Sequence, residues 1–208
     1  MLVNDVHELS QAESHILHPG TRALYRHWEG IRAENAAPHK TDLNLKRISD
    51  LLPNLVIIER DDTESSYKWR LAGTQTCQLY KDEITGKDAL AGWAGFERDT
   101  IVKLFEGVVT NLQPCLIRIR LTTTENQVIA AEMIGLPIRA QNSSKIHIFG
   151  GIFTFRELSS YNYCGIANLE LSGARTIWTE PLPGDALATS LNGNGSRSSF
   201  KVINGGLN

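Results

Sequence analysis

The side chains with the greatest chemical potential in this sequence are its three cysteines and six histidines. Cys77, Cys115 and Cys164 are widely spaced and form no Cys-x-x-Cys pair. Disulfide frameworks and zinc sites need paired or closely spaced thiols, so the sequence predicts reduced thiols. His15 and His18 could share a helical face, but no further ligand is placed to complete a site. We therefore expect no bound metal.

The sequence lacks the short motifs of the common enzyme classes. It contains no Gly-x-Ser-x-Gly elbow, no His-Glu-x-x-His motif and no Ser/His/Asp trio at a recognisable spacing. A phosphate-binding glycine loop is also missing from the part of the chain expected to be ordered. The prediction is a protein that is not an enzyme.

Charge and hydropathy exclude further classes of partner. The chain of 208 residues has 21 Lys+Arg against 23 Asp+Glu, so no positive excess draws it to nucleic acid. No apolar run reaches the roughly 18–20 residues that span a bilayer. Residues 1–5 carry an acid where a signal peptide needs bases. We expect a cytoplasmic protein that neither binds nucleic acid nor inserts into membranes.

The spacing of apolar residues predicts helices before and between the strands. Leu24, Trp28 and Ile31 recur at helical spacing. Thr21 is the expected N-cap of this helix, because Pro19-Gly20 reads as a breaker before it. Further helices are predicted over residues 44–52, 74–80 and 99–111.

Alternation of apolar and polar residues predicts five strands. Tyr67, Trp69 and Leu71 alternate with Lys68 and Arg70, which indicates one buried and one polar face. The predicted strands cover residues 55–58, 67–71, 116–121, 128–138 and 146–155.

Two of these strands carry patterns that bear on binding. Arg118 and Arg120 point to the same sheet face, where they could hold an anion if that face were inward; a solvated outer face is the preferred interpretation. In the last strand Phe149 and Phe153 share a face. Gly151 leaves a gap between them that could be packed or could hold a ligand.

The order of the elements predicts an α+β domain with appendages. Residues 1–20 form an N-terminal arm, residues 21–160 the domain with its flanking helices, and residues 161–182 an extension. Residues 183–208 are rich in Gly, Ser and Asn and are expected to be disordered, because they cannot bury enough apolar surface.

Several motifs occur in the order found in a known family. They are Trp28 with Arg32, Pro38, Leu51-Leu52-Pro53-Asn54-Leu55, Arg70-Leu71-Ala72-Gly73-Thr74, Glu83-Ile84-Thr85-Gly86 and Leu136-Pro137. Over residues 22–158 the chain resembles the bacterial single-domain PAS family, PAS_5, also catalogued as DUF1457. Lys81 stands where this family often has Gly, so a different turn is expected there.

The resemblance implies a five-stranded antiparallel sheet with a helical cluster on one face and flanking helices at the N-terminus. Large side chains of the cluster and of the last strands then form either a pocket wall or packed core. The candidates for a ligand pocket are Cys77, Tyr80, Trp93, Phe96, Phe105, Phe149 and Phe153. The family-motif residues expected to be structural are Trp28, Arg32, Pro38, Pro53, Arg70, Gly73, Thr74 and Gly86.

The resemblance also raises the question of a cofactor. Flavin is not expected, because Cys77 lacks the Asn-Cys-Arg-Phe-Leu-Gln context of flavin-binding photosensory PAS domains. Haem is not expected, because the predicted helix over 99–111 contains no histidine. Any other cofactor is left open by the sequence.

The function implied is that of a regulatory module without catalytic output. It would sense a small molecule, bind a signalling partner protein that the sequence does not identify, or do both. The helix around Trp28 would pack on the outer face of the sheet or on a second subunit, and a homodimer through this helix is the preferred interpretation. The alternative is a ligand-free scaffold for protein–protein interaction.

Overall fold

The computed structural model describes residues 13–33, 35–61, 66–141, 143–160 and 165–178. The predicted disordered tail, residues 183–208, lies outside the described residues, as do residues 1–12 of the predicted arm. Within the described part of the chain, no helix is both long and apolar enough to cross a membrane.

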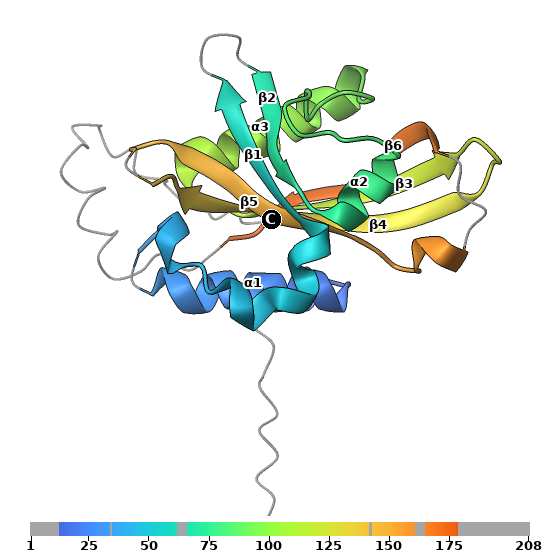
Figure 1. The fold of residues 1–208 in the computed structure, drawn as a ribbon. Helices are drawn as coiled ribbons and strands as arrows, with labels where there is room; N and C mark the ends of the chain where they lie inside the picture. The colour runs from blue at the N-terminus through green and yellow to red at the C-terminus, as the bar shows by residue number, and fades with distance from the viewer. Residues whose placement is uncertain (1–12, 34, 62–65, 142, 161–164, 179–208) are drawn as a thin grey trace, which may run out of the picture.

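An antiparallel sheet forms the centre of the described structure (Figure 1). Its strand order is β2-β1-β5-β4-β3-β6, and all neighbouring strands are antiparallel. The strands are β1 (Leu55–Asp61), β2 (Ser66–Ala72), β3 (Cys115–Thr123), β4 (Val128–Arg139), β5 (Ile146–Thr154) and β6 (Ile166–Thr176). The predicted α+β class and PAS-like antiparallel sheet are confirmed.

Strand β6 is an addition to the five predicted strands. It pairs with β3 from Cys115↔Thr176 to Thr123↔Ile166 and forms one edge of the sheet. Leu169 is its one buried residue, so its sequence lacks the alternation that marks a half-buried strand. Backbone pairing and edge position, rather than a buried face, therefore define β6.

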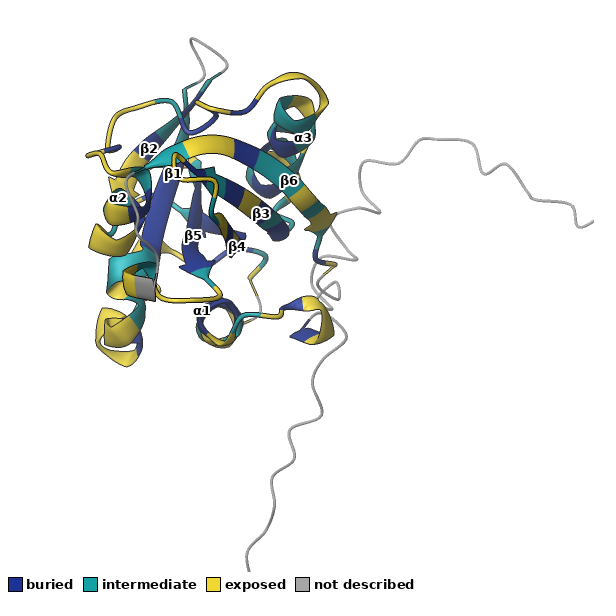
Figure 2. Ribbon diagram, turned by 90° about the vertical axis from the view of Figure 1, so that its right-hand side faces the viewer, coloured by how far each residue is buried: buried dark blue, intermediate teal, exposed yellow. Residues whose placement is uncertain are grey.

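Helices cover both faces of the sheet. In Figure 2, α1 and α3 lie on opposite sides of the buried central strands. The inner face packs against α2 and α3, and the outer face against α1 and the 3₁₀ helix η3. The helices are η1 (Glu13–His15), α1 (Pro19–Arg32), η2 (Lys40–Asp42), η3 (Leu45–Asn54), α2 (Thr74–Tyr80), α3 (Gly95–Asn111) and η4 (Leu158–Ser160).

The start of α1 differs from the prediction. Pro19 is the first residue of the helix, and His18 is its N-cap, with Nδ1 accepting a hydrogen bond from Gly20 N at 3.0 Å. A proline at the first helical position loses no hydrogen bond, so Pro19-Gly20 begins the helix instead of breaking the chain. Thr21 lies inside the helix and is fully buried.

The second predicted strand, β2, contains an irregularity. Ile57 pairs with Leu71 and Ile58 pairs with Trp69, so Arg70 is an extra residue opposite β1. Such a bulge shifts the alternation by one residue. Leu71 is consequently 43% exposed and lies on the outer face, and its predicted place beside Tyr67 and Trp69 is wrong.

Candidate functional site

Three predicted pocket residues, Tyr80, Trp93 and Phe105, line one small cavity on the inner face of the sheet. Its volume is about 10 Å³, roughly the room that one water molecule needs. Phe105 packs edge-on against Tyr67 with 5.2 Å between ring centroids, and Trp69 contacts Tyr80 at 6.1 Å. These side chains form packed core.

The other four pocket candidates lie elsewhere. Phe149 and Phe153 are on the outer face, because the odd-numbered side chains of β5 point toward α1. Phe96 is 80% exposed on α3, and Cys77 is half-buried on α2. The structure therefore does not bring the seven candidates together in one pocket.

The gap predicted at Gly151 is filled. A Cβ built there would lie 2.7 Å from the Phe153 ring and 3.2 Å from Leu24, so both side chains already occupy this space. The His18 ring stacks on Phe153 with 5.2 Å between centroids. Of the two interpretations of the gap, packing is the one observed.

Two of the three cysteines fall within the described residues, and both are free. Burial raises the pKa of the Cys115 thiol to about 12, which keeps it uncharged and unreactive. The Cys77 sulfur lies 3.9 Å from Ala72 O and 3.8 Å from a Glu83 carboxylate oxygen. Cys164 lies outside the described residues.

An apolar groove of about 470 Å³ opens on the outer face, between η2 and η3 and the adjoining ends of β1 and β2. Three leucines of its wall, Leu45, Leu52 and Leu71, are 40–48% exposed. Large apolar side chains left exposed side by side mark binding surfaces. We define the apolar groove by its lining residues, which are Lys40, Leu43, Leu45, Leu52, Pro53, Leu55, Ile57, Leu71, Gly73, Thr74 and Phe149.

Two family motifs build this groove. The Leu52-Pro53 segment and the Gly73-Thr74 turn both line it and contact each other directly. Gly73 N donates to Leu55 O at 2.8 Å, and a Cβ at Gly73 would lie 2.4 Å from Pro53 O. Gly73 therefore has the predicted structural role, because it lets the two motifs approach closely.

Substitution Gly73→Ala is expected to destabilise the fold by about 1–3 kcal/mol, because backbone carbonyls leave no room for the added methyl group. Gly30→Ala on α1 is the matched control, since nothing lies within 4 Å of its added Cβ. Urea unfolding of both variants measures the effect. Equal stability of the two variants would contradict the close approach at Gly73.

Other motif residues also have structural contacts. Arg70 pairs with Glu59 at 2.6 Å, as predicted for an ion-paired arginine. Gly86 adopts φ +84°, and Pro38 O accepts from Arg139 N at 2.9 Å. Lys81 takes the left-handed conformation with φ 53°, which glycine adopts without strain.

The flanking helix α1 is fixed to the outer face of its own sheet. Trp28 is fully buried, and its indole Nε1 donates to Pro137 O at 2.8 Å. The Arg32 guanidinium lies 5.4 Å from the centre of the Trp28 ring and pairs with Glu29 at 2.7 Å. Trp28 and Arg32, which the resemblance places in one motif, are therefore in direct contact.

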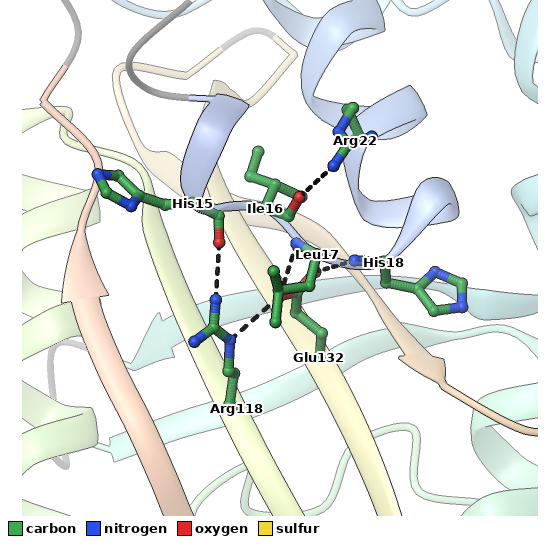
Figure 3. Close-up of polar contacts among 7 residues, drawn as sticks. All are labelled: His15, Ile16, Leu17, His18, Arg22, Arg118 and Glu132. Atoms are coloured by element: carbon green, nitrogen blue, oxygen red, sulfur yellow. Dashed lines mark hydrogen bonds and ion pairs between the residues drawn. The ribbon is translucent and has the colours of Figure 1, made fainter. Parts of the chain in front are cut away.

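A buried carboxylate that the sequence analysis missed holds the segment leading into α1 (Figure 3). Glu132 on β4 is fully buried and accepts hydrogen bonds from Leu17 N at 3.2 Å and His18 N at 2.8 Å. Arg118 on β3 lies 3.4 Å from the same carboxylate and donates to His15 O at 2.8 Å. We call Glu132, Arg118 and residues 15–18 the N-terminal latch.

The contacts of the N-terminal latch show which face of the sheet Arg118 and Arg120 occupy. Arg118 and Arg120 are on the outer face, as preferred from the sequence, and Arg120 lies 3.8 Å from Glu170. A buried carboxylate is stable only when cations and N–H groups satisfy it, which Arg118 and the chain at residues 17–18 do. The signal available in the sequence was an acid inside an otherwise apolar strand.

Three histidines make the stability of the fold depend on pH. Burial is the main cause that lowers the pKa of His18, His27 and His147, although Glu132 and Glu59 oppose it at His18 and His147. The unfolded chain therefore takes up protons more readily than the folded chain as the pH falls below about 6.5.

We expect the free energy of unfolding to fall between pH 7.5 and 5.5. Urea unfolding at half-unit steps tests this, because ordinary carboxylates stay ionised over that range. His147→Gln should flatten the dependence. A stability that rises on acidification would contradict the direction of these shifts.

An antiparallel sheet with a helical cluster on its inner face and a flanking helix on its outer face is the arrangement of a PAS domain, a class that is generally regulatory. A family model described as PAS domain, PAS_5, matches residues 16–153. The chain belongs to this family.

Comparison with curated proteins gives no match. Among solved structures, one similar chain is described as "Flavin Analogue Sheds Light on Light-Oxygen-Voltage Domain Mechanism". It shares 10% sequence identity at a TM-score of 0.41, and the match covers 54% of this chain and 84% of that one.

Proposed function

We propose that this PAS domain acts by binding a small molecule or a partner protein, without catalysis, and that the apolar groove is its binding site. The observation that supports the proposal is the difference in cavity volume between the two faces of the sheet. The inner cavity measures about 10 Å³, whereas the groove measures about 470 Å³ and exposes three leucines. Ligand sites usually measure roughly 300–1,000 Å³.

The position of the groove suggests how binding would be communicated. Leu55 and Ile57 belong both to the groove wall and to the apolar cluster that holds α1 and residue Ile16 of the latch segment. A ligand that shifts the packing of this cluster would change how firmly α1 and the latch segment are held. The regulatory output would then be the exposure of these N-terminal elements.

Native mass spectrometry of the purified protein, beside its denatured mass, tests the proposal. We expect an additional mass that is lost on denaturation and is absent from Leu45→Asp, which places a charge in the groove. Val128→Asp is the control, because Val128 is 52% exposed and lies outside the groove. A retained mass in Leu45→Asp would contradict the site.

A ligand-free scaffold is the second candidate, and the packed inner face favours it. An unliganded mass in every variant would support it.

The same spectra give the number of subunits. A homodimer through α1 would have to use the exposed side of the helix, because Leu24 and Trp28 are buried against the sheet of the same chain.

A further inference from the structure

The wall of the apolar groove is almost uniform in chemistry. Of the described residues that line it, eight carry apolar side chains, and Lys40 is the one with a charge. Thr74 supplies the one side-chain hydroxyl. A bound peptide would bring many backbone amides that need hydrogen-bond partners, whereas the only polar side chains of this wall are those of Lys40 and Thr74. The wall therefore suits a ligand with a long apolar part and few polar groups.

Lys40 gives the apolar groove a positive charge. It begins η2 and is exposed, and no carboxylate of the described residues lies within ion-pair distance of it. The acid nearest in sequence, Asp42, accepts instead from His39 N at 2.9 Å. The charge of Lys40 also contributes to the lowered pKa of His147. A monoanionic group at the groove would match this unpaired cation.

We propose that the apolar groove binds a small amphipathic carboxylate: a free aliphatic chain that lies on the leucines and Phe149 and ends in one carboxylate beside the Lys40 ammonium. This inference rests on the proposed binding function and names the ligand class of the same site. One ammonium with no arginine in the wall fits a single carboxylate better than a dianionic phosphate.

Equilibrium dialysis of the full chain with labelled dodecanoate tests the inference, with octanoate and dodecyltrimethylammonium as competitors below their micellar concentrations. We expect dodecanoate to bind more tightly than octanoate, by up to about fourfold per methylene. The cation with the same chain should bind at least about tenfold more weakly, because it meets Lys40 with the same charge.

Two pairs of variants locate the site. Lys40→Gln should weaken dodecanoate binding by about tenfold, whereas Lys103→Gln, on exposed α3 surface, should leave it unchanged. Leu45→Asp should abolish binding, and Val128→Asp should preserve it. All four positions are exposed, so thermal melts should confirm that the variants fold.

The outcomes separate the inference from the proposed function. If dodecanoate and dodecyltrimethylammonium bind equally well and neither binds to Leu45→Asp, the preference for a carboxylate is wrong. The groove would still be a binding site. No binding of any of the three amphiphiles would overturn the ligand class, while a Leu45-dependent mass in native spectra would still support the proposed function. Dodecanoate binding that survives both Lys40→Gln and Leu45→Asp would overturn this location.

Discussion

Replacement of Glu132 by alanine is expected to release the N-terminal latch and to lower the free energy of unfolding by about 3 kcal/mol. Glu132 is fully buried. Its removal leaves two backbone N–H groups without their acceptor and Arg118 without its ion-pair partner. Hydrogen exchange should locate the effect. The amides of Leu17 and His18 lose their acceptor and should lose their protection almost completely, whereas amides at the centre of the sheet should stay protected and exchange faster only by the factor that corresponds to the global loss.

Glu132→Gln separates the effect of lost hydrogen bonds from the effect of lost side-chain volume, because glutamine has nearly the same size as glutamate. Leu17 N and His18 N bond to different oxygens of the carboxylate, and glutamine replaces one of these oxygens with an NH2 donor, so one of the two N–H groups loses its acceptor. We expect stability and exchange between those of the wild type and of Glu132→Ala. Glu157→Ala, at an exposed glutamate, is the control with no expected effect on either amide. Unchanged exchange at residues 17 and 18 in Glu132→Ala would show that the carboxylate does not hold this segment.

Replacement of Trp28 by alanine should cost about 3–5 kcal/mol, the largest loss that we expect from a single substitution in this chain. The indole is fully buried between α1 and the outer face, and its Nε1–H bonds to Pro137 O. Truncation leaves a cavity, an unpaired carbonyl and an Arg32 without its aromatic contact. Urea unfolding followed by far-UV circular dichroism measures the loss.

Trp178→Ala is the matched control for Trp28→Ala. Trp178 is 74% exposed, so the same truncation there should change stability by less than about 0.5 kcal/mol. If Trp28→Ala unfolds at the same urea concentration as Trp178→Ala, then α1 does not depend on this anchor. In that case the outer-face cluster would have to hold the helix through Leu24 and Tyr25.

Local patterns in the sequence determined most of the fold. Helical and alternating periods are properties of neighbouring residues, so the strands around Tyr67 and Phe149 and the helix around Trp28 were predictable without any knowledge of their partners. The motif order added the PAS arrangement, which the family match confirms. Strand β6 was missed because an edge strand with one buried residue has no such period.

Part of the candidate site could also be predicted from the sequence. The Leu52-Pro53 and Gly73-Thr74 motifs were identified, but only as structural elements. Their separation along the chain gives no sign that they contact each other and line one apolar groove. The acid at Glu132 stood out in an apolar strand, yet its partners at residues 17 and 18 are more than 100 positions away.

The sequence by itself determined five of the six described strands, the helix around Trp28 and the alternation of side chains away from the bulge at Arg70. Only the tertiary structure decided which face each helix covers, and hence that Phe149 and Phe153 lie on the side opposite Phe105. One extra residue at Arg70 was enough to move Leu71 into the groove wall. Periodicity fixes relative orientation within an element, whereas burial, register and groove formation depend on contacts between segments far apart in the chain.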